Sequence, residues 1–231
     1  MSYILAIGDR AYSSWSLRGW LLFDAFAIPV TSRRGQLYTD GFSQLLAEFA
    51  PARTVPALRL PDGTVIADTL AIAEELASRH PEAHHWPAAP RARAIARALV
   101  AEMHAGFAAL RNTCPMNLRA AYTGFAPPAE VLADLDRLAT IWDWARHETG
   151  SDGPWLCGGY SVADAFFAPV AARIAGYALP VSARAQAYVA AHLAHPSFGR
   201  WHAQALVDGP DQPVYDRVLP RRNWPATGAT A

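Results

Sequence analysis

Thr54-Val55-Pro56-Ala57-Leu58 and, a short distance further on, Ala67-Asp68-Thr69-Leu70-Ala71-Ile72 are the stretches from which the fold can be argued. A proline cannot donate to a sheet ladder, so a proline beside a strand belongs at the strand's start, at an edge or at a bulge. An X-Pro bond is also the one linkage at which a cis peptide costs little. We therefore expect a tight chain reversal that exposes the backbone at Val55.

The residues between these stretches predict a hairpin followed by a helix. Residues 57–60 alternate apolar and polar, 61–64 form a turn sequence, and 65–67 resume a strand. Asp68 and Thr69 then open a helical pattern. This order provides two polar binding features. An exposed backbone edge can pair with a peptide, and a helix N-terminus can hold a carboxylate.

These residues resemble the cytosolic glutathione transferases, whose N-terminal domain carries a VPAL strand with a cis-proline and then an acidic residue and a Ser or Thr at a helix start. TVPAL and ADTLAIAEEL fit this pattern, with Asp68-Thr69 where Glu-Ser is more usual. WLCGGYSVADAFFAP, residues 155–169, is similar to the family's second signature. The resemblance implies an α/β thioredoxin-like N-terminal domain followed by an all-α C-terminal helical domain.

Composition excludes several other classes of protein. The chain has 231 residues, 52% hydrophobic and 17% charged, which suffices for one large or two small globular domains. All 20 basic residues are arginine, so lysine-based Schiff-base and P-loop chemistry is excluded. The net charge of zero argues against nucleic acid as the main partner. No apolar run approaches the ~18–20 residues of a membrane span, so we expect no membrane span.

The cysteines and histidines add two further expectations. Cys114 and Cys157 are too few to staple a secreted domain, and the chain begins with a strand-like run at 3–7 instead of a basic and then apolar leader. We therefore expect a cytoplasmic protein with reduced thiols. No metal site is expected, because two histidine pairs, His84-His85 and His192 with His195, lack a third ligand at metal-like spacing.

The chain divides into four parts. Residues 1–80 have the order βαβα and then ββα, with the first helix from Trp15 to Phe26. Residues 81–90, PEAHHWPAAP, form a linker with three prolines. Residues 91–207 are helical, with helices expected at 91–111, at 182–194 and at 197–207, and an interruption at 114–119. Residues 208–231 contain four prolines and are expected to form an extended tail.

A further pattern starts the long apolar helix after residue 160. Ser161 and Asp164 have the spacing of a capping box, with Asp in place of the usual Glu. We assign this pair a structural role. Pro169 is expected to kink this helix or to lie at a bend.

The chemistry implied by the resemblance is activation of the glutathione thiol. A hydroxyl at the N-terminus of a helix favours the bound thiolate. The candidates are Tyr12, Ser13 and Ser14. SSWSLR looks like the SSCSWRVR pattern of zeta-class transferases, the maleylacetoacetate isomerases, although aligning Leu17-Arg18 on the family's Val-Arg places Ala11 at the catalytic serine. We predict Ser13 as the donor, then Ser14, and expect Ser14 to act mainly as the helix cap.

The resemblance also implies which residues bind glutathione. The main chain of Val55, beside Pro56, should pair with the cysteinyl unit. Asp68 should face the γ-glutamyl ammonium and Thr69 the γ-glutamyl carboxylate. Arg53 either reaches the glycyl carboxylate or lies in solvent.

The second substrate should bind between the domains. The side chains expected to line its pocket are Trp15, Met103, Phe107, Met116 and Asn117. Arg119 and Arg173 either meet an acidic electrophile or form surface salt bridges, and the second role is the commoner one.

The function predicted from these residues is a glutathione transferase that adds the thiolate of glutathione, its co-substrate, to a small hydrophobic electrophile in detoxification. One alternative is a glutathione-dependent isomerase of the maleylacetoacetate type. Another is a non-catalytic binding protein on the same fold, since fold does not fix function. The family is usually dimeric, so the resemblance implies a homodimer.

Overall fold

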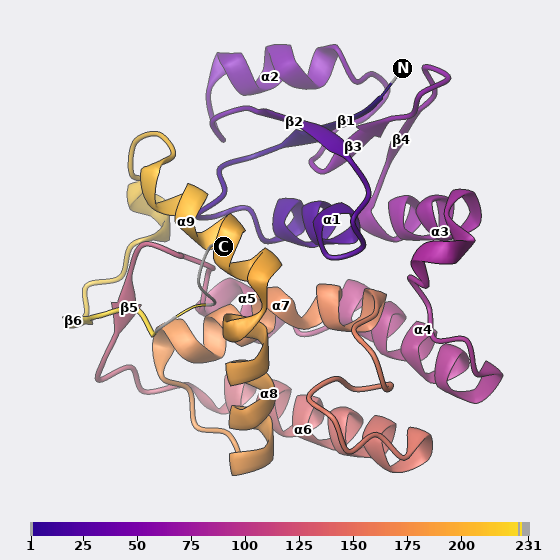
Figure 1. Ribbon diagram of the computed structural model, residues 1–231. Coiled ribbons are helices and arrows are strands. Elements are labelled where there is room, and N and C mark those ends of the chain that lie inside the picture. Colours follow the sequence, from indigo (N-terminus) through magenta and orange to yellow (C-terminus); the bar gives the residue numbers. More distant parts are fainter. Residues whose placement is uncertain (1, 226, 228–231) are drawn as a thin grey trace.

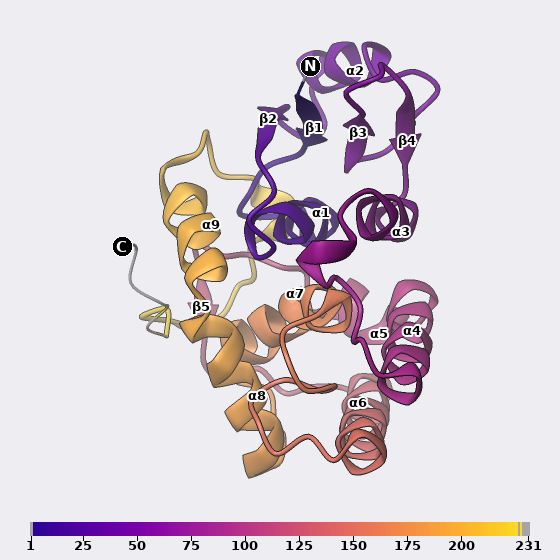
Figure 2. The same ribbon diagram turned by 45° about the vertical axis from the view of Figure 1, so that its right-hand side comes forward.

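The computed structural model describes residues 2–225 and residue 227, and its N-terminal part is a four-stranded sheet between helices (Figure 1). The strands lie in the order β2-β1-β3-β4, with β1 parallel to β2 and antiparallel to β3, and β3 antiparallel to β4. Helix α2 covers one face, and α1 and α3 cover the other (Figure 2). The elements are β1 (Tyr3–Ile7), α1 (Ser14–Asp24), β2 (Val30–Arg34), α2 (Asp40–Ala47), β3 (Ala57–Arg59), β4 (Val65–Ala67) and α3 (Thr69–Arg79).

Strand β1 shows why this sheet is buried on both faces. Successive side chains of a strand point to opposite faces. Leu5 and Ile7 accordingly belong to the main core, whereas Ala6 packs in a smaller cluster with Leu45 and Phe49 from the α2 side. The run of apolar residues in β1 therefore reflects a central strand.

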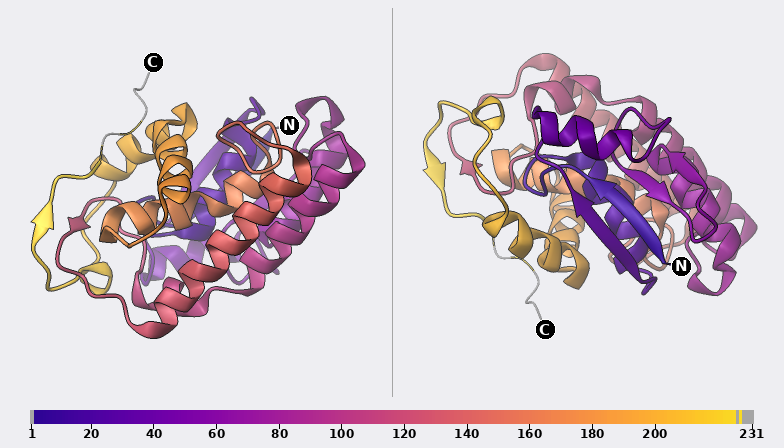
Figure 3. Two further views of the ribbon diagram at one scale, coloured as in Figure 1. Left: turned by 90° about the horizontal axis from the view of Figure 1, so that it is seen from below. Right: turned by 90° about the horizontal axis from the view of Figure 1, so that it is seen from above.

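The C-terminal part is helical and is built around α7, whose residues are all buried. Helix α7 packs against α1, α4 and α8, and α4 and α6 lie side by side (Figure 3, left). The elements are η1 (Pro81–Ala83), α4 (Pro90–Ala105), α5 (Ala108–Thr113), β5 (Ala121–Tyr122), α6 (Ala129–Thr149), α7 (Val162–Tyr177), α8 (Ala183–Ala194), α9 (Pro196–Val207), η2 (Pro213–Tyr215) and β6 (Arg221–Arg222). The predicted fold class, a thioredoxin-like domain followed by a helical domain, is confirmed.

The helix expected over 91–111 is two helices. Helix α4 ends at Ala105, and Phe107 has a φ of 59° in the left-handed region before α5 begins. A side chain at Gly106 would bring a Cβ within 2.7 Å of the Glu102 carbonyl oxygen, so this reversal requires glycine. The interruption predicted at 114–119 is present, because α5 ends at Thr113. The additional break at 106–107 was missed, because the apolar periodicity continues through it.

The described part of the tail is not a free extended arm. Asp208 forms an ion pair with Arg10 at 2.6 Å, and the hydroxyls of Tyr215 and Tyr38 lie 2.9 Å apart. The Gln212 amide donates to Asp9 at 3.3 Å, and this glutamine is buried. The tail is therefore tied to the N-terminal domain by polar contacts, which leave no periodic signal in the sequence.

Asp164 is the polar centre of the helical domain. Its carboxylate accepts from the Ser161 N–H at 3.0 Å, the Ser161 hydroxyl at 3.1 Å, the Leu156 N–H at 3.3 Å and the Tyr188 hydroxyl at 2.8 Å. Burial raises the pKa of Asp164 to about 6, and these four donors oppose the shift. Ser161 and Asp164 form the capping box at the start of α7, and Pro169 lies inside that helix, which continues to Tyr177.

None of the described helices is both long enough and apolar enough to cross a membrane.

Candidate functional site

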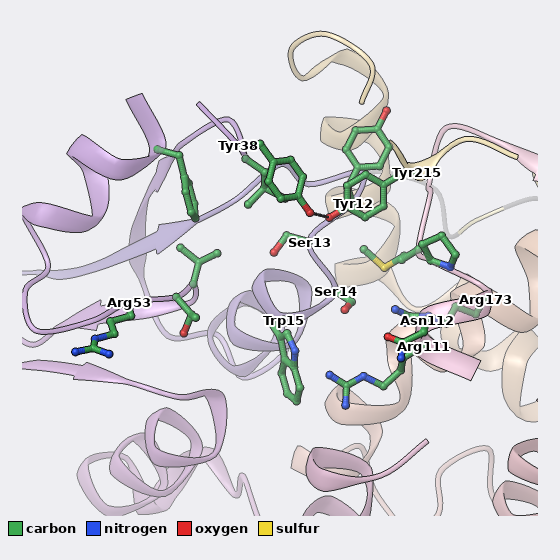
Figure 4. Close-up of a pocket in the computed structure, with 16 residues that line it drawn as sticks. Tyr12, Ser13, Ser14, Trp15, Tyr38, Arg53, Arg111, Asn112, Arg173 and Tyr215 are labelled. Atoms are coloured by element: carbon green, nitrogen blue, oxygen red, sulfur yellow. Dashed lines mark hydrogen bonds between the residues drawn. The ribbon is translucent and has the colours of Figure 1, made fainter. Parts of the chain in front are cut away.

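Two adjoining cavities lie where the N-terminal domain meets the helical domain. The larger, of about 390 Å³, is lined from both domains and from the tail (Figure 4). The smaller, of about 230 Å³, lies at the start of α3. They share Trp15, Thr54 and Val55. The larger is lined by Tyr12, Ser13, Ser14, Trp15, Leu37, Tyr38, Phe42, Arg53, Thr54, Val55, Arg111, Asn112, Pro115, Met116, Arg173 and Tyr215, and the smaller by Trp15, Thr54, Val55, Pro56, Asp68, Thr69 and His104.

Val55 presents free backbone to both cavities. The Val55–Pro56 peptide is cis, and the Pro56 ring packs against α1 so closely that a Cβ on Gly19 would lie 2.7 Å from Pro56 Cγ. Val55 lies just before β3, and among the described residues no hydrogen bond uses its main chain. Its N–H and C=O can therefore pair with an extended peptide.

The start of α3 supplies polar groups to the smaller cavity. Asp68 Oδ1 accepts from the Leu70 N–H at 2.8 Å, and Asp68 Oδ2 lies 3.1 Å from His104 Nε2. The Thr69 hydroxyl is buried and has no hydrogen-bond partner among the described residues. A buried hydroxyl without a partner is costly, so a ligand that bonds it is favoured. His104 comes from α4 and was missed, because one histidine at a helix end carries no distinctive pattern.

Three groups form a short hydrogen-bonded chain at the start of α1. The Gly8 N–H donates to Ser16 Oγ at 3.0 Å, and the Ser16 and Ser13 hydroxyl oxygens lie 2.7 Å apart. Ser13 is the N-cap of α1 and accepts from the Ser16 N–H at 3.4 Å. The chain runs from the buried end of β1 to the edge of the larger cavity.

Burial decides which of the two serine hydroxyls donates in this series of hydrogen bonds. If Ser13 donated to Ser16, the Ser16 proton would have no acceptor among the described residues, although Ser16 is fully buried. An unsatisfied buried polar group costs about 1–3 kcal/mol. Ser16 therefore donates to Ser13, and the Ser13 proton is left for a group in the cavity. Ser16 was not singled out in the sequence, since it reads there as an ordinary helical residue.

Helix capping belongs to Ser13 and not to Ser14, so the expected division of roles was wrong. Ser14 is the first residue of α1, and its side chain lines the larger cavity. Capping uses a lone pair of Ser13 and leaves its proton free, because a hydroxyl accepts and donates at once. The same serine can thus cap the helix and serve a ligand.

Tyr12 directs its hydroxyl away from Ser13 (Figure 4). This hydroxyl donates to Asp211 at 3.2 Å and accepts from the Gln212 N–H at 3.2 Å. The Tyr12 ring stacks on Tyr215 at 4.7 Å. Tyr12 therefore forms part of the wall of the larger cavity and contacts the tail. Its hydroxyl already has hydrogen-bond partners in Asp211 and Gln212.

Only part of the predicted second-substrate pocket lines the cavity. Trp15 and Met116 do, but Met103 and Phe107 are core residues and the Asn117 amide donates to Asp216 at 3.1 Å. Met103 faces the core from within α4, and the break after Ala105 brings residues of α5 to the cavity instead. Arg111, Asn112, Pro115, Arg173, Tyr38 and Tyr215 take those positions.

The two arginines considered from the sequence have different environments. Arg119 forms the expected salt bridge, with Asp211 at 2.8 Å. Arg173 is only 5% exposed, and its Nε donates to the Cys114 carbonyl oxygen at 2.8 Å, so the expectation of a surface salt bridge was wrong. Burial raises the pKa of Cys114 to about 11 and that of Cys157 to about 12, so both thiols stay protonated. Within the described part of the chain, no cluster of three His, Cys, Asp or Glu side chains could hold a metal ion.

A known protein family matches the segment that supplies much of the lining of these cavities. Residues 12–79, which include α1, Val55 and Thr69, match the family model described as glutathione S-transferase, N-terminal domain. This part of the chain is therefore a glutathione S-transferase N-terminal domain. The chain is also 32% identical over 120 residues to maleylacetoacetate isomerase of Dictyostelium discoideum. That match covers 50% of this chain and 52% of the relative, so the chain spans about half the length of that curated protein.

Solved structures share the fold of this chain over most of its length. A glutathione transferase homolog from Burkholderia with bound glutathione has a TM-score of 0.67 at 22% identity, covering 89% of this chain and 98% of that one. Maleylacetoacetate isomerase from Anaeromyxobacter dehalogenans, with bound GSH in the active site, has a TM-score of 0.62 at 22% identity, covering 90% of this chain and 98% of that one. At these identities the likeness shows the common fold.

Proposed function

We propose that this protein is a glutathione transferase that binds glutathione across both cavities and adds its thiolate to a small electrophile. The observation that carries the proposal is the pair of unused polar groups at Val55 and Thr69, which lie on adjoining cavities. The tripeptide backbone pairs with Val55. The γ-glutamyl end occupies the smaller cavity, with its carboxylate at Thr69 and its ammonium at Asp68. The cysteinyl sulfur then lies toward Ser13.

The proposed chemistry is stabilisation of the glutathione thiolate. The bound thiol loses its proton to solvent, and the Ser13 hydroxyl donates to the resulting sulfur anion. The N-terminus of α1 adds partial positive charge at the same point. The thiolate then forms the new carbon–sulfur bond, and the electrophile either loses a leaving group or takes a proton from water. Arg53 lies on the opposite side of the cavity from Arg173 (Figure 4), and we propose it for the glycyl carboxylate.

Asp68→Ala should weaken glutathione binding by about 1.5–3 kcal/mol, the range for a hydrogen bond to a charged group. The carboxylate faces the smaller cavity beside the Thr69 hydroxyl. Isothermal titration of the folded variant with glutathione measures the change. The control is Asp136→Ala, an exposed residue of α6, which should bind glutathione as tightly as the wild-type protein does. Unchanged affinity in the Asp68 variant would remove this residue from the glutathione site.

Ser16→Ala should raise the pKa of bound glutathione by about half a unit, since a donor chain strengthens its last member by only a fraction of one bond. The Gly8 N–H also loses its acceptor, so the free energy of unfolding should fall by about 1–3 kcal/mol. Ultraviolet titration of bound glutathione and denaturant unfolding measure the two effects. A loss of stability with no change in thiol pKa would leave Ser16 a purely structural residue.

A second candidate is glutathione-dependent isomerisation of a double bond. The maleylacetoacetate isomerase of Dictyostelium discoideum named above favours it. In that reaction the thiolate adds to the double bond and leaves again, so glutathione is not consumed. Following a cis-enone and the glutathione concentration together separates the two reactions. Geometric conversion at constant glutathione identifies an isomerase, and loss of both reactants identifies a transferase.

A non-catalytic glutathione-binding protein is the third candidate. Such a protein would retain glutathione without lowering its thiol pKa. Measuring affinity and the pKa of the bound thiol on one sample distinguishes it from an enzyme.

The cytoplasmic location and the homodimer stay predictions. Sedimentation equilibrium of the purified chain tests the second of these.

A further inference from the structure

The smaller cavity contains a pair of titratable side chains that come from different domains. His104 lies in the last turn of α4, and its Nε2 lies 3.1 Å from Oδ2 of Asp68, the residue that precedes α3. Both residues line the cavity. Helices α3 and α4 lie on the same side of the molecule, one in each domain (Figure 2). The pair therefore bridges the two domains at the place proposed for the γ-glutamyl end of glutathione.

Both carboxylate oxygens of Asp68 already have a neighbour. Oδ1 accepts from the Leu70 N–H at 2.8 Å and so caps α3, while Oδ2 faces His104. An ammonium that binds Asp68 from the cavity must therefore share Oδ2 with His104. A neutral imidazole can share this oxygen, because a carboxylate oxygen has two lone pairs, but an imidazolium repels the ammonium.

The other neighbours of His104 are aromatic rings and, beside one of them, two arginines. The Trp15 ring of α1 lies 5.1 Å from the His104 ring, and the Phe166 ring of α7 lies 6.4 Å from it. The guanidinium of Arg18 in α1 lies 4.4 Å from the Trp15 ring, and that of Arg111 in α5 lies 5.0 Å from it. These two cations oppose a charge on His104, whereas the C-terminal end of α4 favours one. Both effects are present with and without a ligand, so neither changes on binding.

The second ring nitrogen makes the charged form of His104 dependent on Asp68. Nδ1 is buried and has no hydrogen-bond partner among the described residues. In the imidazolium both ring nitrogens carry hydrogen, so the Nδ1–H would be buried without an acceptor, which is costly. In the neutral ring the hydrogen can lie on Nε2 and donate to Asp68, and Nδ1 then needs no acceptor. A ligand cation that takes up the charge of Asp68 therefore favours the neutral ring.

We infer that His104 is a positioning residue that releases a proton to solvent when the γ-glutamyl ammonium of glutathione binds Asp68. In the free protein the imidazolium pairs with the carboxylate. In the complex the neutral imidazole still holds Oδ2, and the ammonium supplies the positive charge. Because the free protein then binds more protons than the complex, the affinity for glutathione rises with pH across the range in which histidines titrate. This inference rests on the proposed function for the position of the γ-glutamyl end.

The test uses S-methylglutathione, whose sulfur is blocked, so that no thiol proton enters the count. Titration calorimetry at pH 6.5 in MES and in bis-Tris, two buffers with different ionisation enthalpies, gives the number of protons released per bound ligand. The wild-type protein should release about 0.3–0.7 proton, and its Kd should be about three- to tenfold lower at pH 7.0 than at pH 5.5. The carboxyl groups and the α-ammonium of the ligand change little in this window.

His104→Gln separates the charge of this residue from its hydrogen bond, because the amide can still donate to Asp68 but never ionises. This variant should bind S-methylglutathione without proton release and with the same Kd at pH 5.5 and pH 7.0. Asp68→Asn keeps the histidine but removes its carboxylate partner, so it should lose the proton release as well. The control is His147→Asn, an exposed residue of α6 outside both cavities, which should keep the wild-type values.

Three results would overturn the inference while glutathione still binds. One is unchanged proton release in folded His104→Gln, and another is a wild-type protein that binds the ligand without releasing a proton. The third is proton uptake, which would mean that the imidazolium pairs with the γ-glutamyl carboxylate. The wild-type measurement needs no variant, so it decides even if His104→Gln fails to fold. No binding of S-methylglutathione at any pH would instead remove the proposed glutathione site, and this inference with it.

Discussion

Replacing Asp164 with alanine should lower the free energy of unfolding by about 3–5 kcal/mol, because it leaves several buried neutral donors unpaired at about 1–3 kcal/mol each. The carboxylate accepts hydrogen bonds from Leu156, Ser161 and Tyr188. Alanine leaves these donors buried and unbonded, and it also removes the cap of α7. Urea unfolding at pH 7.5, where this carboxylate is ionised, measures the loss.

The matched control is Asp143→Ala, which removes a half-exposed carboxylate from α6 and should change stability little. Asp164 lies outside both cavities, so turnover per folded molecule should stay near the wild-type value. Unchanged stability with a collapse of turnover would mean that Asp164 acts in catalysis and not in folding.

Ser13→Ala should raise the pKa of the bound glutathione thiol by about one to two units, each unit corresponding to about 1.4 kcal/mol. Turnover at neutral pH should fall by about 10- to 100-fold, because each unit lowers the fraction of bound glutathione present as thiolate about tenfold. The reason is that the hydrogen bonds run from the Gly8 N–H to Ser16 and from Ser16 to Ser13, so that Ser13 is the hydroxyl left to donate to the thiolate. Ultraviolet titration at the thiolate band gives the pKa.

Ser14→Ala is the comparison for this experiment, because Ser14 lines the same cavity without joining the chain. It should leave the thiol pKa within a few tenths of a unit of the wild-type value. A rise in Ser14→Ala with none in Ser13→Ala would transfer the role to Ser14. No rise in either would leave the backbone N–H groups of α1 as the donors and favour a binding protein over an enzyme.

Local sequence patterns predicted those helices and strands whose position depends on one apolar periodicity or on one helix-capping residue. The alternation after Pro56 and the Asp68-Thr69 start gave β3, β4 and α3. The spacing of Ser161 and Asp164 gave the start of α7. Such signals act over a few residues, so they are visible without a structure.

The parts of the site that the sequence did not predict depend on long-range contacts. Arg173 was considered from the sequence, but its burial and its contact with the Cys114 carbonyl oxygen appear only in the folded chain. His104 reaches Asp68 from the other domain. Helix α4 ends beside Gly106, where a side chain would clash with the Glu102 carbonyl oxygen. A single glycine within an apolar pattern is a weak local signal. The division of roles between Ser13 and Ser14 also needed the position of Ser16.

The tail gives this protein a particular order of assembly. Gln212 meets Asp9 across 203 positions of sequence, and Tyr215 completes the cavity that begins at Tyr12. During synthesis an N-terminal domain emerges and folds first. The thioredoxin-like domain can therefore form early, but the wall that Tyr215 supplies is added only when almost the whole chain has left the ribosome. A nascent chain halted within α9 would carry the residues proposed for glutathione and still lack a finished pocket for the second substrate.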